Sequence, residues 1–371
     1  MTNDKQPTTN NQPINLFDYE ALAPQNLSPI ALDYYAGGAW DEVTLRNNRT
    51  AFDALKLLPR MLVDVSQRDL STEILGEPVS LPIMIAPMAF QCLAHPEGEI
   101  ATAKAATALG TVMILSTMST KSLEEVAQVP HETNQWFQLY IHRDRSLTRA
   151  LVERAEAAGF KALCLTVDAP MLGCRERDRL NQFTLPSGME LANLATMADL
   201  EIPQTAGESG LLSYFAQQID PSLTWWDVEW LHSLTSLPIA IKGILRADDA
   251  LRAVEYGAKA VIVSNHGGRQ LDGAIATIDA LPEIVAAVGE QAEVLIDGGI
   301  RRGTDVLKAL ALGAKGVLLG RPVLWGLACA GETGVRHILE LLRNELDVAM
   351  GLSGCATIQD IDSSLVKRLF T

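Results

Sequence analysis

The chain contains eight short apolar runs, and segments with the residue spacing of amphipathic helices lie between them. Gly159 and Gly257 follow two of the helical segments, 146–158 and 248–255, as glycine commonly does at a helix C-terminus. Alternation of this kind predicts parallel strands that are covered by helices. The eight runs lie at residues 83–86, 112–115, 136–141, 162–167, 238–241, 260–263, 294–296 and 316–319.

Eight strand and helix units predict an α/β fold, a closed (β/α)8 or TIM barrel. The alternative is a doubly wound open sheet, but no glycine-rich G-x-G-x-x-G turn follows the first run. We therefore expect a single barrel domain over residues 14–371.

Two regions interrupt the regular alternation. Helical patterns at 14–58 precede the first strand and predict an N-terminal helical extension. The connection after the fourth strand, about 174–237, is far longer than usual, which predicts a mobile lid over about 176–222. At its end, Thr224 with Asp227 three residues later is expected to cap a helix. Residues 1–13 are polar and are expected to form a disordered tail.

The overall charge and the cysteines exclude several classes of protein. The formal net charge is −15, which disfavours nucleic acids and anionic lipids as partners. The five cysteines are scattered without a C-x-x-C pair, which indicates reduced thiols in a cytoplasmic protein rather than disulfides or a metal site. No apolar run approaches the length of a membrane span, so we expect no membrane association.

Hydrogen-bonding residues follow almost every predicted strand. Examples are Ser116 and Lys242, each directly after an apolar run, and Gln138 and Thr166, each within one. Because barrel enzymes carry their active sites at the C-terminal ends of the strands, these side chains should meet at one face. Such an array of donors and acceptors suits a planar heterocycle with polar edges.

The last two strand exits suggest a phosphate site. Residues 297–303 read Asp-Gly-Gly-Ile-Arg-Arg-Gly, and Gly320-Arg321 follow the eighth run. Glycines allow backbone N–H groups to approach phosphate oxygens, and the N-terminus of a following helix favours negative charge. Either motif alone is more often a simple turn, so the prediction depends on the pair.

The sixth exit carries a base and a cation. His266 and Arg269 stand three residues apart, immediately after the run 260–263. An imidazole beside a fixed guanidinium is suited to removing a proton next to a carboxylate. The alternative is a solvated loop with a histidine of no function.

Taken together, these motifs resemble the FMN-dependent L-2-hydroxy acid oxidase family, of the lactate oxidase and glycolate oxidase type. The resemblance runs from about Asn15 to Ser364. It implies an FMN cofactor, a small 2-hydroxy acid and O2 as substrates, and a homotetramer. The motifs that carry it lie at residues 33–35, 82–87, 95–99, 137–140, 166–168, 264–272, 297–305 and 320–322.

The resemblance also implies a role for each candidate residue. His266 would be the catalytic base, and Asp168 would pair with its imidazolium form. Arg175 and Arg269 would hold the substrate carboxylate with forked hydrogen bonds.

The remaining candidates would surround the substrate and the cofactor. Tyr34 and Tyr140 would bind the substrate's carboxylate and hydroxyl groups, and Lys242 would lie beside the flavin edge that becomes negative on reduction. The flavin ring, ribityl chain and phosphate would be lined by Pro87, Met88, Ala89, Ser116, Gln138, Tyr140, Thr166, Ser264, Asp297, Gly298, Gly299, Ile300, Arg301, Gly320 and Arg321.

Structural alternatives exist for several of these residues. Asp168 could be a helix N-cap, Arg175 could belong to a surface charge cluster, and Tyr34 could simply pack in the core. Lys242 ends a barrel strand, as a Schiff-base lysine would, so an aldolase is a competing hypothesis. A barrel that merely stores FMN is another, although it would not need a grip for carboxylates.

Three residues of the expected substrate pocket depart from the pattern of plant glycolate oxidases. Met88, Met118 and Phe215 stand where those enzymes have Thr, Trp and Val. A flexible methionine in place of the tryptophan leaves room for a methyl group beside the α-carbon. We therefore expect L-lactate, oxidised to pyruvate with production of H2O2, to be preferred over glycolate. Glycolate oxidation and a soluble dehydrogenase with another electron acceptor stay as alternatives.

Overall fold

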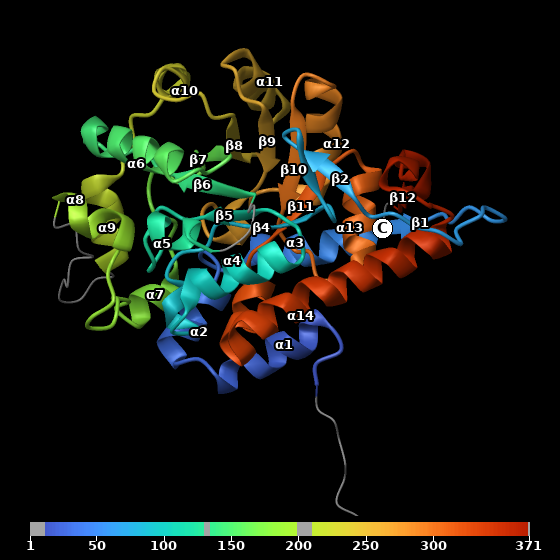
Figure 1. Ribbon diagram of the computed structural model, residues 1–371, viewed down its shortest axis with the longest axis horizontal. Helices are drawn as coiled ribbons and strands as arrows, with labels where there is room; N and C mark the ends of the chain where they lie inside the picture. Colours follow the sequence, from blue (N-terminus) through green and yellow to red (C-terminus); the bar gives the residue numbers. More distant parts are fainter. Residues whose placement is uncertain (1–11, 130–133, 199–209, 370–371) are drawn as a thin grey trace, which may run out of the picture.

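The computed structural model describes residues 12–129, 134–198 and 210–369, and within them eight parallel strands close into a barrel (Figure 1). The neighbour order around the barrel is β10-β11-β4-β5-β6-β7-β8-β9, which is sequence order once the circle is closed. The predicted TIM barrel is therefore confirmed. The strands are β4 (Ile83–Ile85), β5 (Met113–Leu115), β6 (Gln135–Leu139), β7 (Ala162–Thr166), β8 (Ile239–Ile244), β9 (Ala260–Val263), β10 (Glu293–Asp297) and β11 (Gly316–Leu319).

Each barrel strand is buried on both faces, which explains why the sequence shows continuous apolar runs rather than alternation. Along β9, Ala260 and Ile262 belong to the core inside the barrel, and Val261 and Val263 to the core between barrel and helices. The eight predicted runs all became strands. The largest difference at a C-terminal end is in β8, which continues to Ile244 instead of ending at residue 241.

Helices surround the barrel (Figure 1). The predicted helices 146–158 and 248–255 are α6 and α11, and Gly159 and Gly257 adopt φ values of +87° and +91° just after them. The helix α14 begins directly after β11 and is interrupted at Ala330 and Gly331. The helices of the barrel layer are α4 (Gly98–Ala108), α5 (Leu123–Ala127), α6 (Arg145–Ala157), α11 (Ala247–Glu255), α12 (Thr277–Val288), α13 (Gly303–Ala311) and α14 (Arg321–Ser353).

The predicted N-terminal helical extension is confirmed as α1 (Leu16–Leu22), α2 (Pro29–Ala36) and α3 (Val43–Thr50), with short 3₁₀ turns at Ala23–Gln25 and Ala51–Ala54. The helix α1 runs beside α14 (Figure 1). Strand β1 (Leu55–Leu57) then pairs with β12 (Val366–Arg368), which ties the extension to the end of the described chain.

A small hairpin closes the N-terminal end of the barrel. Its strands are β2 (Thr72–Ile74) and β3 (Glu77–Val79), and Ile74 and Val79 pack into the interior core of the barrel. The carboxylate of Glu293, at the start of β10, accepts a hydrogen bond from the backbone N–H of Leu75 at 3.0 Å. Among the described residues, the hairpin contributes nothing to the cavity at the C-terminal ends of the strands.

The long connection after β7 contains more regular structure than the sequence suggested. It forms α7 (Glu176–Leu180), α8 (Ala192–Ala198), α9 (Gly210–Gln218) and α10 (Trp225–His232). The predicted cap at Thr224 is confirmed, because the carboxylate of Asp227 accepts hydrogen bonds from its N–H and hydroxyl groups. Residues 199–209 of the expected mobile lid, and residues 1–11 of the expected disordered tail, lie outside the described ranges.

Candidate active site

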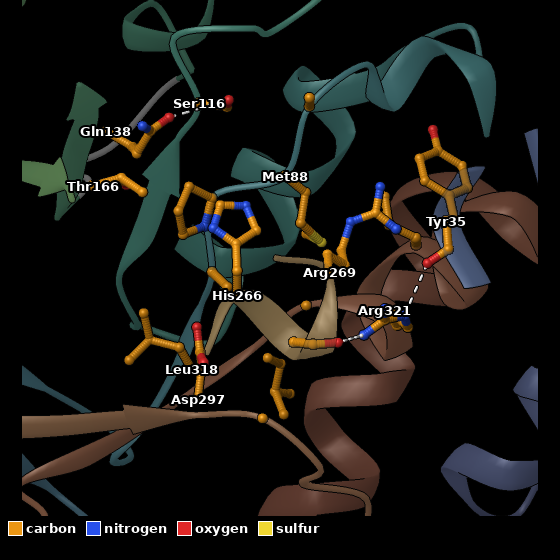
Figure 2. A pocket seen from close by; sticks show the side chains of 18 of the residues that line it. Tyr35, Met88, Ser116, Gln138, Thr166, His266, Arg269, Asp297, Leu318 and Arg321 are labelled. Atoms are coloured by element: carbon orange, nitrogen blue, oxygen red, sulfur yellow. Dashed lines mark hydrogen bonds between the residues drawn. The ribbon is translucent and has the colours of Figure 1, made fainter. Parts of the chain in front are cut away.

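A deep cavity lies at the C-terminal ends of the barrel strands, the face at which barrel enzymes carry their active sites (Figure 2). It holds about 1080 Å³ of space, its open mouth included, which is ample for a ligand of cofactor size. All predicted site residues line it except Asp168 and Ser264, which stand behind its wall. The lining ones are Tyr34, Pro87, Met88, Ala89, Ser116, Met118, Gln138, Tyr140, Thr166, Arg175, Phe215, Lys242, His266, Arg269, Asp297, Gly298, Gly299, Ile300, Arg301, Gly320 and Arg321.

The exits of β7 and β9 place Asp168 against His266. The Nδ1 atom of His266 lies 2.7 Å from Oδ1 of Asp168. Burial lowers the pKa of His266 below its usual value, although Asp168 opposes this. Burial would raise the pKa of Asp168, but His266 and Lys242 bring it below its usual value. The imidazole is therefore neutral near pH 7, with Nδ1–H donating to the carboxylate and the Nε2 lone pair free to accept a proton.

The loop that presents His266 is tightly wound. His266 has a φ of +56°, and Gly267 and Gly268 have φ values of +62° and +75°. A left-handed conformation costs a non-glycine residue about 1 kcal/mol or more, so the surrounding structure must hold it. Ser264 contributes to this, because its hydroxyl accepts hydrogen bonds from the N–H of His266 at 3.1 Å and from Nζ of Lys242 at 2.8 Å.

Two guanidinium groups line the same cavity as the imidazole, that of Arg175 buried and that of Arg269 partly buried. Arg175 donates to the carbonyl of Arg269 and to Oε1 of Gln270, both at 3.3 Å. Arg269 donates to the carbonyls of Tyr34 and Gly37 and lies over the Tyr34 ring, 4.9 Å from its centre. Burial and the charge of Arg269 lower the pKa of Arg175 to about 10. This paired positive charge favours an anionic ligand.

Two tyrosines contribute hydroxyl groups to the same end of the cavity. The ring of Tyr34 stacks on Phe183 at a centroid distance of 4.3 Å, and Tyr140 meets the edge of Phe215 at 5.5 Å. Burial raises the pKa of both Tyr34 and Tyr140. Both phenols are therefore protonated at neutral pH and can donate hydrogen bonds.

Apolar side chains complete this end of the cavity. Met88 follows β4, Met118 follows β5, and Phe215 comes from α9 in the long connection. All three are buried, with no more than 9% of their surface exposed. The cavity therefore combines a cationic grip with an apolar wall, as a small carboxylic acid with an apolar substituent requires.

Lys242, in β8, sits deep in the cavity and pairs with Asp297 at the end of β10, 3.1 Å away. Burial would lower the pKa of Lys242, but Asp297, Asp168 and Cys164 raise it above its usual value. A protonated lysine cannot act as the nucleophile of a Schiff base. The ion pair instead provides a fixed positive charge on the cavity wall.

Arg321 marks the opposite end of the cavity from Gln138 and Ser116 in Figure 2. It donates to three backbone carbonyls, those of Tyr35, Gly267 and Gly37, at 2.8–2.9 Å. Burial lowers its pKa well below the usual value, and Arg269 and Arg301 add to this effect. A bound phosphate would relieve this concentration of positive charge, and it would also lie at the N-terminus of α14.

The loop after β10 leaves no room for side chains at its two glycines. Gly298 and Gly299 have φ values of +97° and +80°, and a Cβ on Gly299 would collide with the carbonyl oxygen of Asn48. These features fit a backbone cradle for phosphate.

Several polar atoms along the cavity wall make no hydrogen bond to the described residues. Gln138 Nε2, Thr166 Oγ1 and Asp297 Oδ1 are buried and have no hydrogen-bond partner among the described residues. Because buried polar groups are nearly always satisfied, they indicate a ligand with polar edges at these positions. Together with the phosphate end, they fit the FMN that the sequence resemblance implies. These residues would hold its ring, its ribityl chain and its phosphate.

The structural alternatives for individual residues can now be judged. Asp168 does not cap a helix, since α7 begins after Arg175. Arg175 is 7% exposed, so it is not part of a surface charge cluster. Tyr34 does pack in the core, and it also lines the cavity.

Some residues of the site were missed from the sequence. Gln270 accepts hydrogen bonds from Arg175 and from the N–H of Gly173, and it donates to the carbonyl of Asp168. It lies within the 264–272 motif, so its neighbourhood was a usable signal. Asn48 and Asp178 are buried polar residues beside the site, and nothing in their local sequence distinguishes them from exposed ones.

Comparisons with known proteins agree with this geometry. The sequence matches the family described as FMN-dependent dehydrogenase over residues 23–368. It is 67% identical to the L-lactate oxidase of Nostoc sp. over 362 residues, which cover 97% of this chain and 99% of that protein. It is 52% identical to Glycolate oxidase 3 of Arabidopsis thaliana over 353 residues, 95% of each chain. A crystal structure of mandelate oxidase with (S)-4-hydroxymandelic acid superposes with a TM-score of 0.90 at 46% identity, covering 96% of this chain and 98% of that one.

Proposed function

The chain belongs to the family of FMN-dependent dehydrogenases, and we propose that it oxidises an L-2-hydroxy acid, with L-lactate preferred, to the 2-oxo acid. O2 is the proposed electron acceptor and is reduced to H2O2. For L-lactate the overall reaction is L-lactate plus O2 to pyruvate plus H2O2.

One observation carries the proposal. A neutral imidazole, oriented by a carboxylate 2.7 Å away, faces the same cavity as the guanidinium groups of Arg175 and Arg269. A 2-hydroxy acid needs both parts, because its carboxylate must be fixed while a proton is removed at the adjacent carbon or its hydroxyl.

When the substrate binds, Arg175 and Arg269 donate hydrogen bonds to its carboxylate, and the Tyr34 hydroxyl donates to it as well. Tyr140 donates to the 2-hydroxyl group. The apolar substituent then lies against Met88, Met118 and Phe215. This arrangement orients the substrate and excludes water from the reacting carbon.

His266 accepts the proton at Nε2 while Asp168 stabilises the imidazolium that forms. FMN, when bound, supplies the chemistry of accepting two electrons from the substrate and delivering them to O2. The protonated Lys242 offers a fixed positive charge where negative charge would develop on the reduced ring.

The choice of L-lactate rests on the apolar wall. A methyl group on the substrate contacts methionine and phenylalanine side chains, which is worth about 1–3 kcal/mol against a substrate that lacks it. The high identity to an L-lactate oxidase supports the same choice. Glycolate oxidation is the second candidate, favoured by relatives that are 52–53% identical.

The test is anaerobic mixing of the flavin-loaded protein with L-lactate, D-lactate or glycolate, followed by admission of air. We expect the flavin colour to bleach fastest with L-lactate, and colour and H2O2 to appear together in air. Faster bleaching by glycolate would favour the second candidate. Bleaching without recovery in air would indicate a dehydrogenase, and no bleaching would overturn the proposal.

We further propose that the enzyme is a cytoplasmic homo-oligomer, a tetramer, of single-domain subunits. Exposed apolar side chains in two neighbouring segments support assembly: Met61, Leu62 and Val63 in one, and Val348 and Leu352 in the other. All five cysteines are free thiols, as expected in a reducing compartment. Light scattering after size-exclusion chromatography tests the tetramer, and cell fractionation tests the cytoplasmic location. Among the described residues, no helix combines the length and the apolar character of a membrane span.

A further inference from the structure

We propose that Asn48 and Asn265 form a positioning pair that couples the catalytic loop, residues 264–269, to the phosphate loop, residues 297–303. The geometry of the base and the affinity for FMN then depend on one another. Asn48 lies in α3 of the N-terminal extension, and Asn265 precedes His266 at the exit of β9. The consequence for catalysis rests on the proposed function, in which His266 is the base.

The two amides bind each other in both directions. Asn48 Nδ2 donates to Asn265 Oδ1 at 2.8 Å, and Asn265 Nδ2 donates to Asn48 Oδ1 at 2.7 Å. Both residues are buried, with exposures of 2% and 5%. In such surroundings an amide left without its partner is costly, so the pair is strongly held in one arrangement.

On one side the pair holds the catalytic loop. Asn265 Oδ1 also accepts from the N–H of Gly268 at 3.2 Å, and Asn265 Nδ2 also donates to the carbonyl of Ile275. The bond to Gly268 closes the tight turn that places His266 at a positive φ, and the bond to Ile275 ties Asn265 to the segment that leads into α12. A Cβ on Gly268 would lie 2.6 Å from the backbone N of Leu45, so α3 packs directly on this turn.

On the other side the pair reaches the phosphate loop. Asn48 Oδ1 accepts from the N–H of Thr277 at 3.4 Å, and the hydroxyl of Thr277 donates to the carbonyl of Asp297. The carbonyl of Asn48 occupies the space that a side chain on Gly299 would need. The next residue in α3, Arg49, donates to the carbonyl of Gly299 at 2.8 Å.

Because one residue of α3 contacts both loops, a shift of either loop must displace the amide pair or break its bonds. Neither Asn48 nor Asn265 lines the cavity, so both act through other residues. A ligand that fixes the phosphate loop therefore also stabilises the turn that carries the base. Because such coupling is reciprocal, a substitution that destabilises the catalytic loop must also weaken FMN binding.

The experiment uses Asn48→Ala, Asn265→Ala and the double variant. The FMN dissociation constant of each apoprotein is measured from the quenching of FMN fluorescence, and kcat and KM for L-lactate are measured with saturating FMN. We expect Asn265→Ala to weaken FMN binding about tenfold although it lies on the base's loop. We expect Asn48→Ala to lower kcat about tenfold with less than a twofold change in KM.

The double variant tests whether the two asparagines are coupled. If the pair acts as a unit, the double variant is no more than about twofold worse than the worse single variant in both measurements. Effects that multiply in the double variant would overturn the proposal. If Asn48→Ala does not fold, Asn48→Asp replaces it, because it keeps the shape and the acceptor but loses the donor to Asn265.

Gln135→Leu is the matched control. Gln135 is a buried amide at the start of β6, at the opposite end of the barrel, and donates to the carbonyl of Val126 at 3.2 Å. Gln135→Leu should lower the urea concentration at the midpoint of unfolding while leaving FMN affinity and kcat unchanged. If the Asn48 and Asn265 variants behave in the same way, their role is merely structural and the coupling is wrong. A wild type that oxidises no L-2-hydroxy acid would overturn the proposed function, whereas the FMN affinities would still decide the coupling.

Discussion

The two ends of the cavity are built in different ways. The end proposed for the phosphate is formed by backbone and one cation, with Gly298 and Gly299 packed against α3 and the Arg321 side chain bound to three carbonyls. The end proposed for the substrate is formed by side chains, among them Met118 after β5 and Phe215 from α9. A backbone cradle tolerates almost no substitution, whereas an apolar wall of side chains can change size without moving a strand. This difference suggests that cofactor and chemistry are fixed while the size of the substrate can vary.

The largest expected effect is at His266, the proposed base. Replacement of His266 by Gln should lower the anaerobic rate of flavin bleaching by L-lactate about a thousandfold, because the base is lost. FMN should remain bound. His232→Gln, at the end of α10 and remote from the cavity, is the control and should keep the wild-type rate. A rate within tenfold of wild type would remove His266 from the role of base.

The next effect concerns the carboxylate grip. Arg175→Lys should lower kcat/KM for L-lactate about a hundredfold, because an ammonium group cannot form the forked pair of bonds. Arg177→Lys is the matched control, since Arg177 is an exposed arginine two residues away that pairs with Glu42. Equal losses in both variants would show that Arg175 does not contact the substrate.

The third prediction concerns pH. His266 must be neutral to act, and burial lowers its pKa, so kcat/KM should fall only as the pH drops below the usual imidazole value of about 6.5. Asp168→Asn removes a charge that raises this pKa. The acid limb of the profile should therefore move to lower pH, and the rate at neutral pH should fall some tens of fold because the imidazolium is no longer stabilised. A limb that moves to higher pH would contradict the pairing.

A smaller effect is expected at the apolar wall. Met118→Trp should fill the space beside the substrate's methyl group and lower the ratio of kcat/KM for L-lactate to that for glycolate about tenfold. Met118→Leu, which is apolar and of similar volume, should keep the wild-type ratio. If Met118→Trp leaves the ratio unchanged, the methyl group binds elsewhere.

The smallest effect tests how α9 is held. The Tyr214 hydroxyl lies 3.1 Å from Nε2 of His142, whose pKa burial lowers to about 4, so the histidine is neutral. Tyr214→Phe should lower the free energy of unfolding by about 1 kcal/mol, measured with urea, and raise KM for L-lactate about twofold through the adjacent Phe215. An unchanged KM would show that Phe215 is positioned by other contacts.

Much of the fold could be predicted because the barrel strands are buried on both faces and therefore appear as apolar runs. The run 260–263 became β9 without a change of boundary. The long connection was harder to predict, since α8 and α9 form where the sequence predicted only a mobile lid. Tertiary contacts hold α9, for example the hydrogen bond between Tyr214 and His142, which lies just after β6.

The site shows the same division. The sequence by itself determined which side chains stand at the strand exits, since parallel strands bring their C-terminal ends to one face. Only the tertiary structure decided the pairing of Asp168 with His266, across 98 residues of sequence, and the burial that keeps the imidazole neutral. It alone brought Asn48 against Asn265, because a hydrogen bond between segments 217 residues apart depends on how the extension packs on the barrel. Local sequence sets which groups are available, and packing sets their distances and their charge states.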